Sequence, residues 1–171
     1  SIMNFLPLGE GERVTSILPM PKEVKKETSS LMMVTKEGVA KKVATASFHD
    51  VRISGIIAIK LDGKDELVSA SFTHNKDTVI VVTEKGQSIH FKEADIREMG
   101  RTAMGVRAIK LGKGDAVISA EAVPNTMNNG NLMVISANGY GKCTDIDEYK
   151  IQNRGGSGIK TANVTPKTGN L

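Results

Sequence analysis

Three stretches of the chain share one pattern of apolar and polar positions. Each begins with an apolar run, passes through a polar turn that ends in glycine, and continues as a second run in which apolar and polar residues alternate. The stretches are LMMVTKEGVAKK (31–42), VIVVTEKGQSIH (79–90) and NLMVISANGYGK (131–142). Alternation with period two around a glycine turn predicts a β-hairpin in each stretch. We expect positive φ at the turn glycines, Gly38, Gly86 and Gly139.

The pattern continues at similar distances beyond each turn glycine. A large apolar residue stands ten positions on, where we expect core packing: Phe48, Ile96 and Tyr149. An arginine follows in each repeat: Arg52, Arg101 and Arg154. A second glycine then opens what we call the re-entrant segments, GIIAIKL (55–61), GVRAIKL (105–111) and GIKTANV (158–164). The chain is therefore built of internal repeats of about 50 residues.

Each repeat unit is expected to contain four short strands, because a glycine-containing turn and a closing strand follow the first two re-entrant segments. These closing strands are ELVSASF (66–72) and AVISAEAV (116–123). Residues 1–20 match the second half of a preceding unit, and residues 21–30 and 124–130 are predicted as loops. The units then cover approximately 1–20, 31–77, 78–130 and 131–171. We predict a single all-β, propeller-like array of four-stranded blades, incomplete at roughly three and a half units, with no helix longer than about two turns.

The composition agrees with this interpretation. Val, Ile and Thr number 15, 15 and 13, whereas Phe, Tyr and Trp together supply six residues. An excess of β-branched residues is typical of strands. No apolar run approaches the roughly 20 residues that a membrane-spanning helix needs, so we expect no membrane partner. The single cysteine, Cys143, cannot form an internal disulfide, which fits a cytoplasmic location, and no metal-ligand spacing is present.

The net charge of +4 is unevenly distributed. Residues 1–100 contain as many basic as acidic side chains, so residues 101–171 carry the whole excess. No Asp or Glu follows Glu148, whereas Lys150, Arg154, Lys160 and Lys167 do. A basic segment of this kind is typical of a surface that binds a polyanion, although a solvated surface without acids would look the same.

Basic residues also recur at corresponding positions of successive units, which would place one charge per blade along a rim. Such a row could follow the phosphates of duplex DNA without reading bases. Few aromatic residues are available for stacking, which disfavours single strands. The candidate DNA-binding residues are Lys41, Lys42, Arg52, Lys60, Arg101, Arg107, Lys110, Lys142, Lys150, Arg154 and Lys160. Alternatively, the arginines could bridge carboxylates between blades, with Asp50 near Arg52 and Glu98 near Arg101.

Several segments resemble the C-terminal DNA-wrapping domain of the DNA gyrase A subunit. They are SIMNFLPLGEGERVTSILP (1–19), MGRTAMGVRAIKL (99–111) and NGYGKCTDIDEY (138–149). The resemblance runs nearly from end to end. It implies a β-pinwheel, a propeller-like disc usually of six blades, whose basic perimeter bends duplex DNA. A full disc would need roughly 300 residues, so the chain corresponds to a portion of one.

The resemblance also implies a place in a larger enzyme. Wrapping by this domain supports ATP-dependent negative supercoiling by gyrase, an A2B2 assembly of the A subunit with the ATPase B subunit. The breakage tyrosine and the ATPase lie in other domains or subunits of that family. We accordingly expect no catalytic residue and no cofactor in this chain, with ATP and Mg²⁺ acting only in the holoenzyme. The residues themselves show no catalytic constellation either.

The family's signature heptapeptide, Q-(R/K)-R-G-G-(R/K)-G, is partly present at 152–158. The matching residues are Gln152, Arg154, Gly155, Gly156 and Gly158, whereas Asn153 and Ser157 stand where the family has cations. The match falls in the third unit, although the family's full motif lies in the first blade. We therefore interpret residues 152–158 as a degenerate copy, here called the box copy, and expect the full motif upstream of Ser1.

Two other functions fit the same residues. One is the corresponding domain of the topoisomerase IV A subunit, which has fewer and more degenerate blades and does not wrap DNA to supercoil it. The other is a propeller that binds protein and uses its rim charges for solubility. A full heptapeptide upstream would favour gyrase over topoisomerase IV, and a duplex-binding titration would test the protein-binding alternative.

Overall fold

The computed structural model describes residues 6, 8–19, 29–49, 51–52, 54–127 and 129–171. These residues form strands and three short 3-10 helices. They are β1 (Ser29–Thr35), β2 (Val39–Ala44), η3 (Thr45–Phe48), β3 (Leu67–His74), β4 (Thr78–Thr83), β5 (Gln87–Lys92), η4 (Glu93–Asp95), β6 (Val106–Arg107), β7 (Val117–Val123), β8 (Asn131–Ile135), β9 (Gly141–Asp145), η5 (Ile146–Glu148) and β10 (Ile159–Lys160). The predicted all-β fold is confirmed, and the three hairpins lie where the sequence pattern places them.

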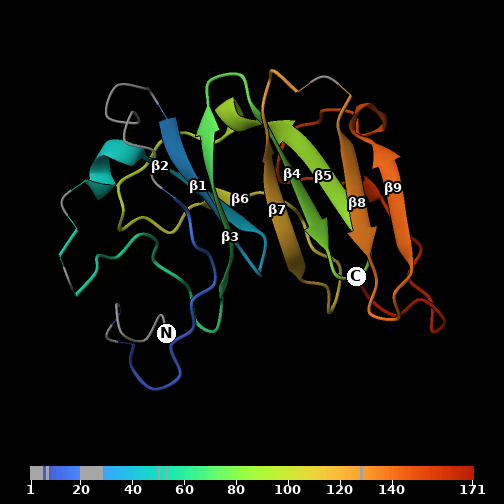
Figure 1. Ribbon diagram of the computed structural model, residues 1–171, viewed down its shortest axis with the longest axis horizontal. Coiled ribbons are helices and arrows are strands. Elements are labelled where there is room, and N and C mark those ends of the chain that lie inside the picture. Colours follow the sequence, from blue (N-terminus) through green and yellow to red (C-terminus); the bar gives the residue numbers. More distant parts are fainter. Residues whose placement is uncertain (1–5, 7, 20–28, 50, 53, 128) are drawn as a thin grey trace.

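The strands form three antiparallel sheets that follow one another across the molecule (Figure 1). The first blade has the order β3-β1-β2-β6, and the second has the order β10-β5-β4-β7. The hairpin β8-β9 forms the third sheet. The inner edges of the first two blades meet, because β3 packs against β7 and the Ser69 hydroxyl donates to the Ala120 carbonyl. The outer edges are therefore β6 and β10.

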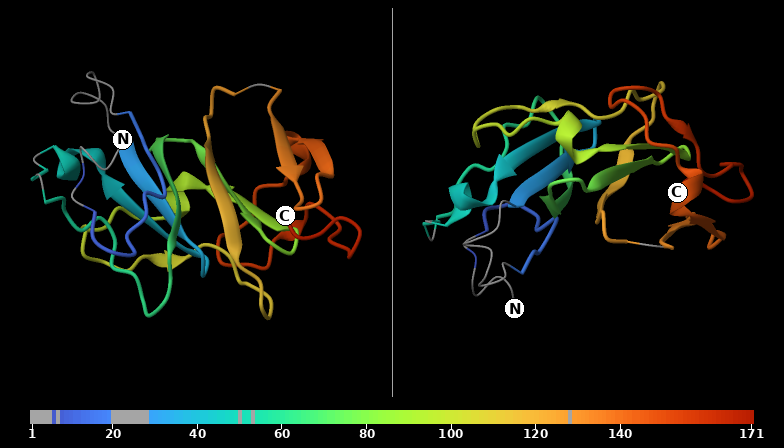
Figure 2. Two further views of the ribbon diagram at one scale, coloured as in Figure 1. Left: turned by 60° about the horizontal axis from the view of Figure 1, so that its bottom comes forward. Right: turned by 90° about the horizontal axis from the view of Figure 1, so that it is seen from above.

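The outer strand of each complete blade comes from the following repeat unit, a feature that the sequence did not predict. β6 belongs to the re-entrant segment 105–111, yet it pairs with β2 of the preceding unit. In the same way β10, from segment 158–164, pairs with β5. Each blade thus takes three strands from its own unit and one from the next. Figure 2 shows the connecting segments passing between neighbouring sheets.

The joints between units repeat in atomic detail. The Ala108 amide donates to the Gly38 carbonyl at 2.8 Å, and the corresponding Thr161 amide donates to Gly86 at 2.9 Å. Earlier in each unit, the Met99 and Gln152 amides donate to Lys42 and His90 at 2.8 and 2.9 Å. Two successive units are therefore joined by the same set of backbone hydrogen bonds.

Glycine is required at both ends of this joint. A Cβ on Gly158 would lie 2.1 Å from the Ser88 carbonyl oxygen, and one on Gly105 would lie 2.7 Å from that of Ala40. On the hairpin side, a Cβ on Gly86 would lie 2.4 Å from the Ala162 oxygen. Real Cβ atoms do not approach backbone this closely, so a side chain at these positions would separate the two units.

The hairpin turns are also held by aspartates from the turn before each closing strand. Asp65 accepts hydrogen bonds from the Glu37 and Glu66 amides, both at 2.9 Å. Asp115 accepts from the Lys85 and Ala116 amides, at 3.0 and 2.9 Å. The same carboxylate therefore ties the hairpin turn to the closing strand in both complete blades.

Apolar side chains fill the space between the sheets. The main core contains Met32 and Val34 of the first blade together with Val81, Ile89 and Phe91 of the second. Of the three predicted core positions, Ile96 is fully buried, Tyr149 is buried and Phe48 is half-buried. A smaller cluster around Ile80, Ile146 and Tyr149 joins the second blade to the third hairpin.

Two segments in which the repeat pattern predicts strands, within residues 8–19 and 55–61, do not form them. Residues 8–19 lie mostly exposed, and the re-entrant segment 55–61 exposes 64% of Ile57. No hairpin of a preceding unit is present among the described residues for segment 55–61 to join. That residues 1–20 belong to a preceding unit remains a prediction. Of the predicted loop 21–30 the structure describes only Ser29 and Ser30, and the prediction is wrong there, because both residues begin strand β1 and pair with β2 or β3.

A pair of glycine substitutions separates turn conformation from contact between units. Gly86 and Gly139 have φ of +81° and +80°, but a Cβ on Gly139 would have no neighbour within 4 Å. Backbone strain alone should cost about 1–3 kcal/mol for valine at either position. We expect Gly86→Val to destabilise more than Gly139→Val, because it must also displace the segment around Ala162. Urea unfolding of both variants measures the difference, and equal losses would show that the close contact carries no cost.

Candidate nucleic-acid interface

The outer strands of the two complete blades each present a basic side chain at the same position. Arg107 lies on β6 opposite Val39, and Lys160 lies on β10 opposite Gln87. Both residues stand two positions after the re-entrant glycine, and both are exposed. Strand exchange, the pairing of β6 and β10 with the hairpin of the preceding unit, thus places a cation on the outer edge of one blade and an equivalent cation on the outer edge of the next.

Other predicted cations are also exposed. Lys110 and Lys60 share one position in successive re-entrant segments, three residues beyond the position of Arg107. Arg52, Lys142 and Lys150 are exposed as well. Lys142 donates to the Thr161 carbonyl at 3.2 Å, and Lys160 donates to the Asn163 side chain at 3.2 Å. These partners are neutral, so they leave the positive charge of both ammonium groups uncompensated.

Lys41 differs from this group because its side chain is fully buried. Its ammonium donates to the carbonyl oxygens of Ala58 at 3.0 Å, of Ala103 at 2.8 Å, and of Arg101. Lys41 therefore links its own re-entrant segment to the loop of the next unit. Its predicted contact with DNA would require three hydrogen bonds to break, so we leave it out of the interface.

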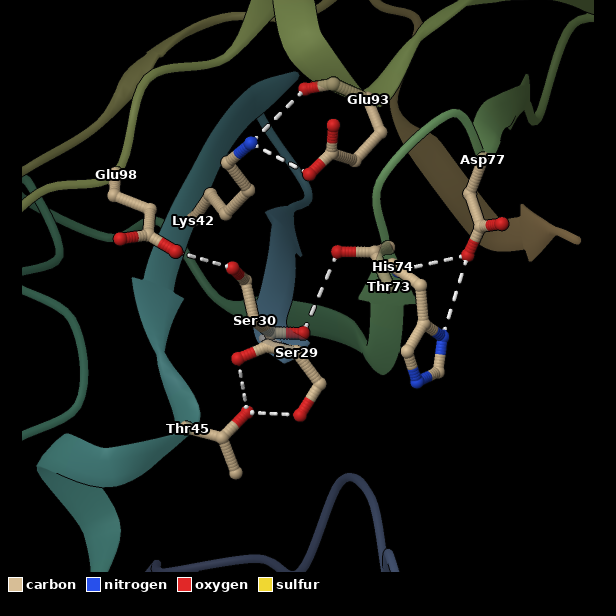
Figure 3. A network of polar contacts seen from close by, with 9 residues as sticks. All are labelled: Ser29, Ser30, Lys42, Thr45, Thr73, His74, Asp77, Glu93 and Glu98. Atoms are coloured by element: carbon tan, nitrogen blue, oxygen red, sulfur yellow. Dashed lines mark hydrogen bonds and ion pairs between the residues drawn. The ribbon is translucent and has the colours of Figure 1, made fainter. Parts of the chain in front are cut away.

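Lys42 also points into the molecule. Its ammonium lies 2.6 Å from a carboxylate oxygen of Glu93, at the start of η4, and both side chains are almost completely buried. Figure 3 shows this pair together with a second contact between the two units, the 2.6 Å hydrogen bond from Ser30 to Glu98. Lys42 thus binds the next unit through an ion pair, and we leave it out of the interface too.

The repeated arginines contact the preceding unit, but through carbonyl groups. Arg154 donates from Nη1 to the Arg107 carbonyl at 3.0 Å and from Nε to the Asp95 carbonyl at 2.9 Å. Arg101 makes the corresponding contact from Nη1 to the Ile57 carbonyl at 3.5 Å. Both arginines are half-buried. As the alternative interpretation expects, Arg101 connects its own unit to the preceding one. Its acceptor there is the backbone oxygen of Ile57 and not the expected carboxylate. Asp50, expected near Arg52, lies outside the described residues.

The box copy lies against the second complete blade and the re-entrant segment 105–111. Gly155 donates to Ala108 at 2.6 Å, and Lys110 donates to Gly156 at 2.8 Å. Gly158 is the glycine that approaches Ser88, and the Gln152 amide bonds to His90. The residues that match the signature heptapeptide therefore make backbone contacts between units.

Comparison with known proteins gives these repeats a family. The profile described as "DNA gyrase C-terminal domain, beta-propeller" matches residues 29–74, 77–124 and 130–170. The chain belongs to this family.

Relatives of the gyrase C-terminal domain family match along almost the whole chain. The DNA gyrase A subunit of Buchnera aphidicola is 40% identical over 168 residues, and that of Salmonella typhimurium is 39% identical over 170. The matches cover 98% and 99% of this chain but 19% of each relative. The chain thus spans about a fifth of the length of these relatives.

Two solved structures have the same fold. The C-terminal domain of DNA topoisomerase IV superposes with a TM-score of 0.87 at 22% identity, covering 99% of this chain and 51% of the other. A DNA gyrase A C-terminal domain superposes with a TM-score of 0.83 at 28% identity, covering 99% and 55%. This gyrase-family chain therefore matches about half of each solved domain.

The described part of this gyrase-family chain offers few other sites. It contains no group of three His, Cys, Asp or Glu side chains that could hold a metal ion. A search of the same residues finds no helix with the length and apolarity needed to span a membrane. Cys143 is exposed on β9.

Sequence reasoning named both Arg107 and Lys160 but missed that they are equivalent. The signal was present, because both stand two residues beyond a re-entrant glycine. The burial of Lys41 and Lys42 had no local signal, because the hydrogen-bond partners of their ammonium groups lie 17 to 62 positions away in the sequence.

The buried ammonium of Lys41 should make stability depend on pH. Burial lowers the pKa of Lys41 below its ordinary value of 10.5, and the nearby Arg101 guanidinium adds to this effect. Between the two values the unfolded chain binds more protons than the folded one, so stability should rise with pH through that window. We expect Lys41→Met to lower stability overall and to abolish this rise.

Melting temperatures measured at several pH values up to about 10.5 test the expectation. Lys64→Met is the control, because Lys64 is exposed. Parallel curves for wild type and Lys41→Met would contradict the assignment.

Proposed function

We propose that this chain is part of the DNA-wrapping domain of a gyrase A subunit, in which it binds duplex DNA along its outer strands. The observation that carries the proposal is the equivalence of Arg107 on β6 and Lys160 on β10. Because the joints between units repeat, these cations follow one another with the spacing of the blades. Lys110 adds a second exposed cation beside β6.

A row of this kind suits the backbone of a duplex. DNA carries one negative charge per about 1.7 Å of helix axis, so cations on successive blades meet phosphates without a sequence requirement. Contacts on more than one blade of a curved array favour a bent path, since the duplex must follow the outer edges to reach them all. Binding is expected to be independent of sequence because phosphate contacts carry no base information.

The family supports gyrase as the parent enzyme. The curated relatives named above, which are 39–40% identical, are gyrase A subunits. The topoisomerase IV domain is similar in fold at lower identity, so topoisomerase IV remains the second candidate. In a gyrase, the ATPase B subunit together with the rest of the A subunit would use the bent duplex for strand passage in the cytoplasm. ATP and Mg²⁺ would act there and have no proposed role in this chain.

A double substitution tests the outer-strand surface. Arg107→Ala with Lys160→Ala removes two proposed phosphate contacts, so the slope of log K against log salt should fall by about 1.8, or 0.9 per contact. Affinity should drop equally for two duplexes of unrelated sequence. The measurement is fluorescence anisotropy across a salt series, with circular dichroism to verify that the variant folds.

The matched control is Lys64→Ala with Lys113→Ala. These exposed lysines occupy corresponding turns that lead into the inner strands β3 and β7, and their loss removes the same charge. Equal losses for both pairs would mean that bulk charge alone drives binding, and the outer-strand surface would be rejected. A wild-type chain that binds neither duplex would favour the protein-binding alternative.

A second experiment distinguishes gyrase from topoisomerase IV. The full-length subunit, combined with its ATPase partner, should introduce negative supercoils into relaxed plasmid when ATP is present. Arg107→Ala with Lys160→Ala in the same protein should reduce supercoiling more than ATP-dependent relaxation, because only supercoiling requires a wrapped segment. A wild-type enzyme that relaxes but never supercoils would assign the chain to topoisomerase IV.

A further inference from the structure

We infer that Arg154 and the box copy are positioning elements, which hold the cation-bearing strand of the preceding unit in place for DNA. This inference rests on the proposed function, since it assigns to Arg154 a role through Arg107 and Lys110. It differs from the expectation for a basic signature motif, in which the arginine itself contacts phosphate.

The first support is the orientation of the guanidinium. Arg154 reaches back to the preceding unit and donates to two of its carbonyl groups, those of Asp95 and Arg107. The second of these carbonyls belongs to the residue whose side chain forms the proposed phosphate contact. Arg154 therefore fixes the backbone from which the Arg107 side chain extends.

The second support comes from the two edges of segment 106–110. On one edge β6 pairs with β2, and Ala108 donates to Gly38. On the other edge the box copy adds two backbone hydrogen bonds, from Gly155 to Ala108 and from Lys110 to Gly156. The short strand is thus held on both sides, and the box copy supplies the partners that a sheet edge otherwise lacks.

The third support explains the glycine in the motif. Gly155 has a φ of +80°, and a Cβ there would stand 3.5 Å from the Arg107 carbonyl oxygen. The positive φ favours glycine, and that conformation turns the Gly155 amide onto Ala108. A motif that combines arginine with glycine in this way suits attachment to a neighbouring backbone.

The preceding unit gives an internal comparison. There Thr102 and Ala103 replace Gly155 and Gly156, and the Lys60 amide lies 3.4 Å from the Ala103 carbonyl, against 2.8 Å in the box copy. The arginine contact is longer too, at 3.5 Å from Arg101 to Ile57. The joint with the longer contacts holds segment 55–61, which has Ile57 at the position that Arg107 occupies in segment 105–111. The joint with the shorter contacts, formed by the box copy, therefore holds the segment that carries a cation at this position.

The decisive variant keeps the charge of residue 154. Lysine can contact a phosphate as a point charge, but it lacks the rigid planar guanidinium that directs Nε and Nη1 of Arg154 to two separate carbonyls. If Arg154 positions Arg107 and Lys110, Arg154→Lys and Arg154→Ala should both weaken duplex binding by roughly three- to tenfold, the effect of impairing one or two phosphate contacts. In an Arg107→Ala, Lys110→Ala background, Arg154→Lys should cause no further loss. If Arg154 binds phosphate directly, Arg154→Lys should retain most of the affinity, and Arg154→Ala should weaken binding in either background.

Amide hydrogen exchange without DNA provides an independent readout. Arg154→Lys should speed exchange at the Lys110 amide, which bonds to Gly156, while leaving the core amide of Val81 protected. Arg101→Lys is the matched control, because the segment that Arg101 contacts has Ile57 at the cation position. This variant should weaken DNA binding less. Wild-type exchange at Lys110 together with wild-type DNA binding in Arg154→Lys would overturn the inference.

The outcomes separate the two proposals. If Arg107→Ala with Lys160→Ala leaves duplex binding unchanged, the proposed outer-strand surface fails whatever happens at Lys110. If that pair weakens binding as expected and Arg154→Lys behaves as wild type, the surface stands and the positioning role of the box copy fails.

Discussion

The close approach of each re-entrant glycine to the backbone of the preceding blade is the contact on which the rest of the structure depends. Gly105 and Gly158 bring the chain against Ala40 and Ser88 at distances that exclude a side chain. From that point the chain has to run along the preceding hairpin, where β6 and β10 complete the blades. The outer surface, and the cations on it, are consequences of this contact.

The repeat itself could be predicted from sequence because its signals are local. Alternation around Gly38, Gly86 and Gly139 identifies hairpins, and each hairpin is present. Strand exchange could not be predicted in this way. The segment GVRAIKL has the pattern of a strand whichever blade it joins, and its partner is decided by backbone hydrogen bonds that side-chain patterns do not encode.

The same limit explains why some of the candidate basic residues are buried and others are exposed. Lys41 and Lys42 are neighbours in a strand and were expected at the surface, yet both faces of β2 are covered. Carbonyl groups of residues 58, 101 and 103 surround one ammonium, and Glu93 pairs with the other. Part of the positive charge of the chain is therefore used to hold units together. By contrast, Arg107 and Lys160 lie on the outer strands β6 and β10, and both residues are exposed.

Strand exchange also means that two strands of one blade are synthesised far apart in time. The first hairpin is complete once residue 44 has left the ribosome, but its outer edge has no partner until β6 follows, more than 60 residues later. The same delay separates β5 from β10. We therefore expect each newly made unit to close the blade made before it, so that the hairpin synthesised last keeps an unpaired edge until the next unit follows. An open strand edge is the part of a sheet most prone to pairing with other chains. For a protein of this architecture, we expect one such interval for each blade, with a length that depends on how fast the next unit is translated.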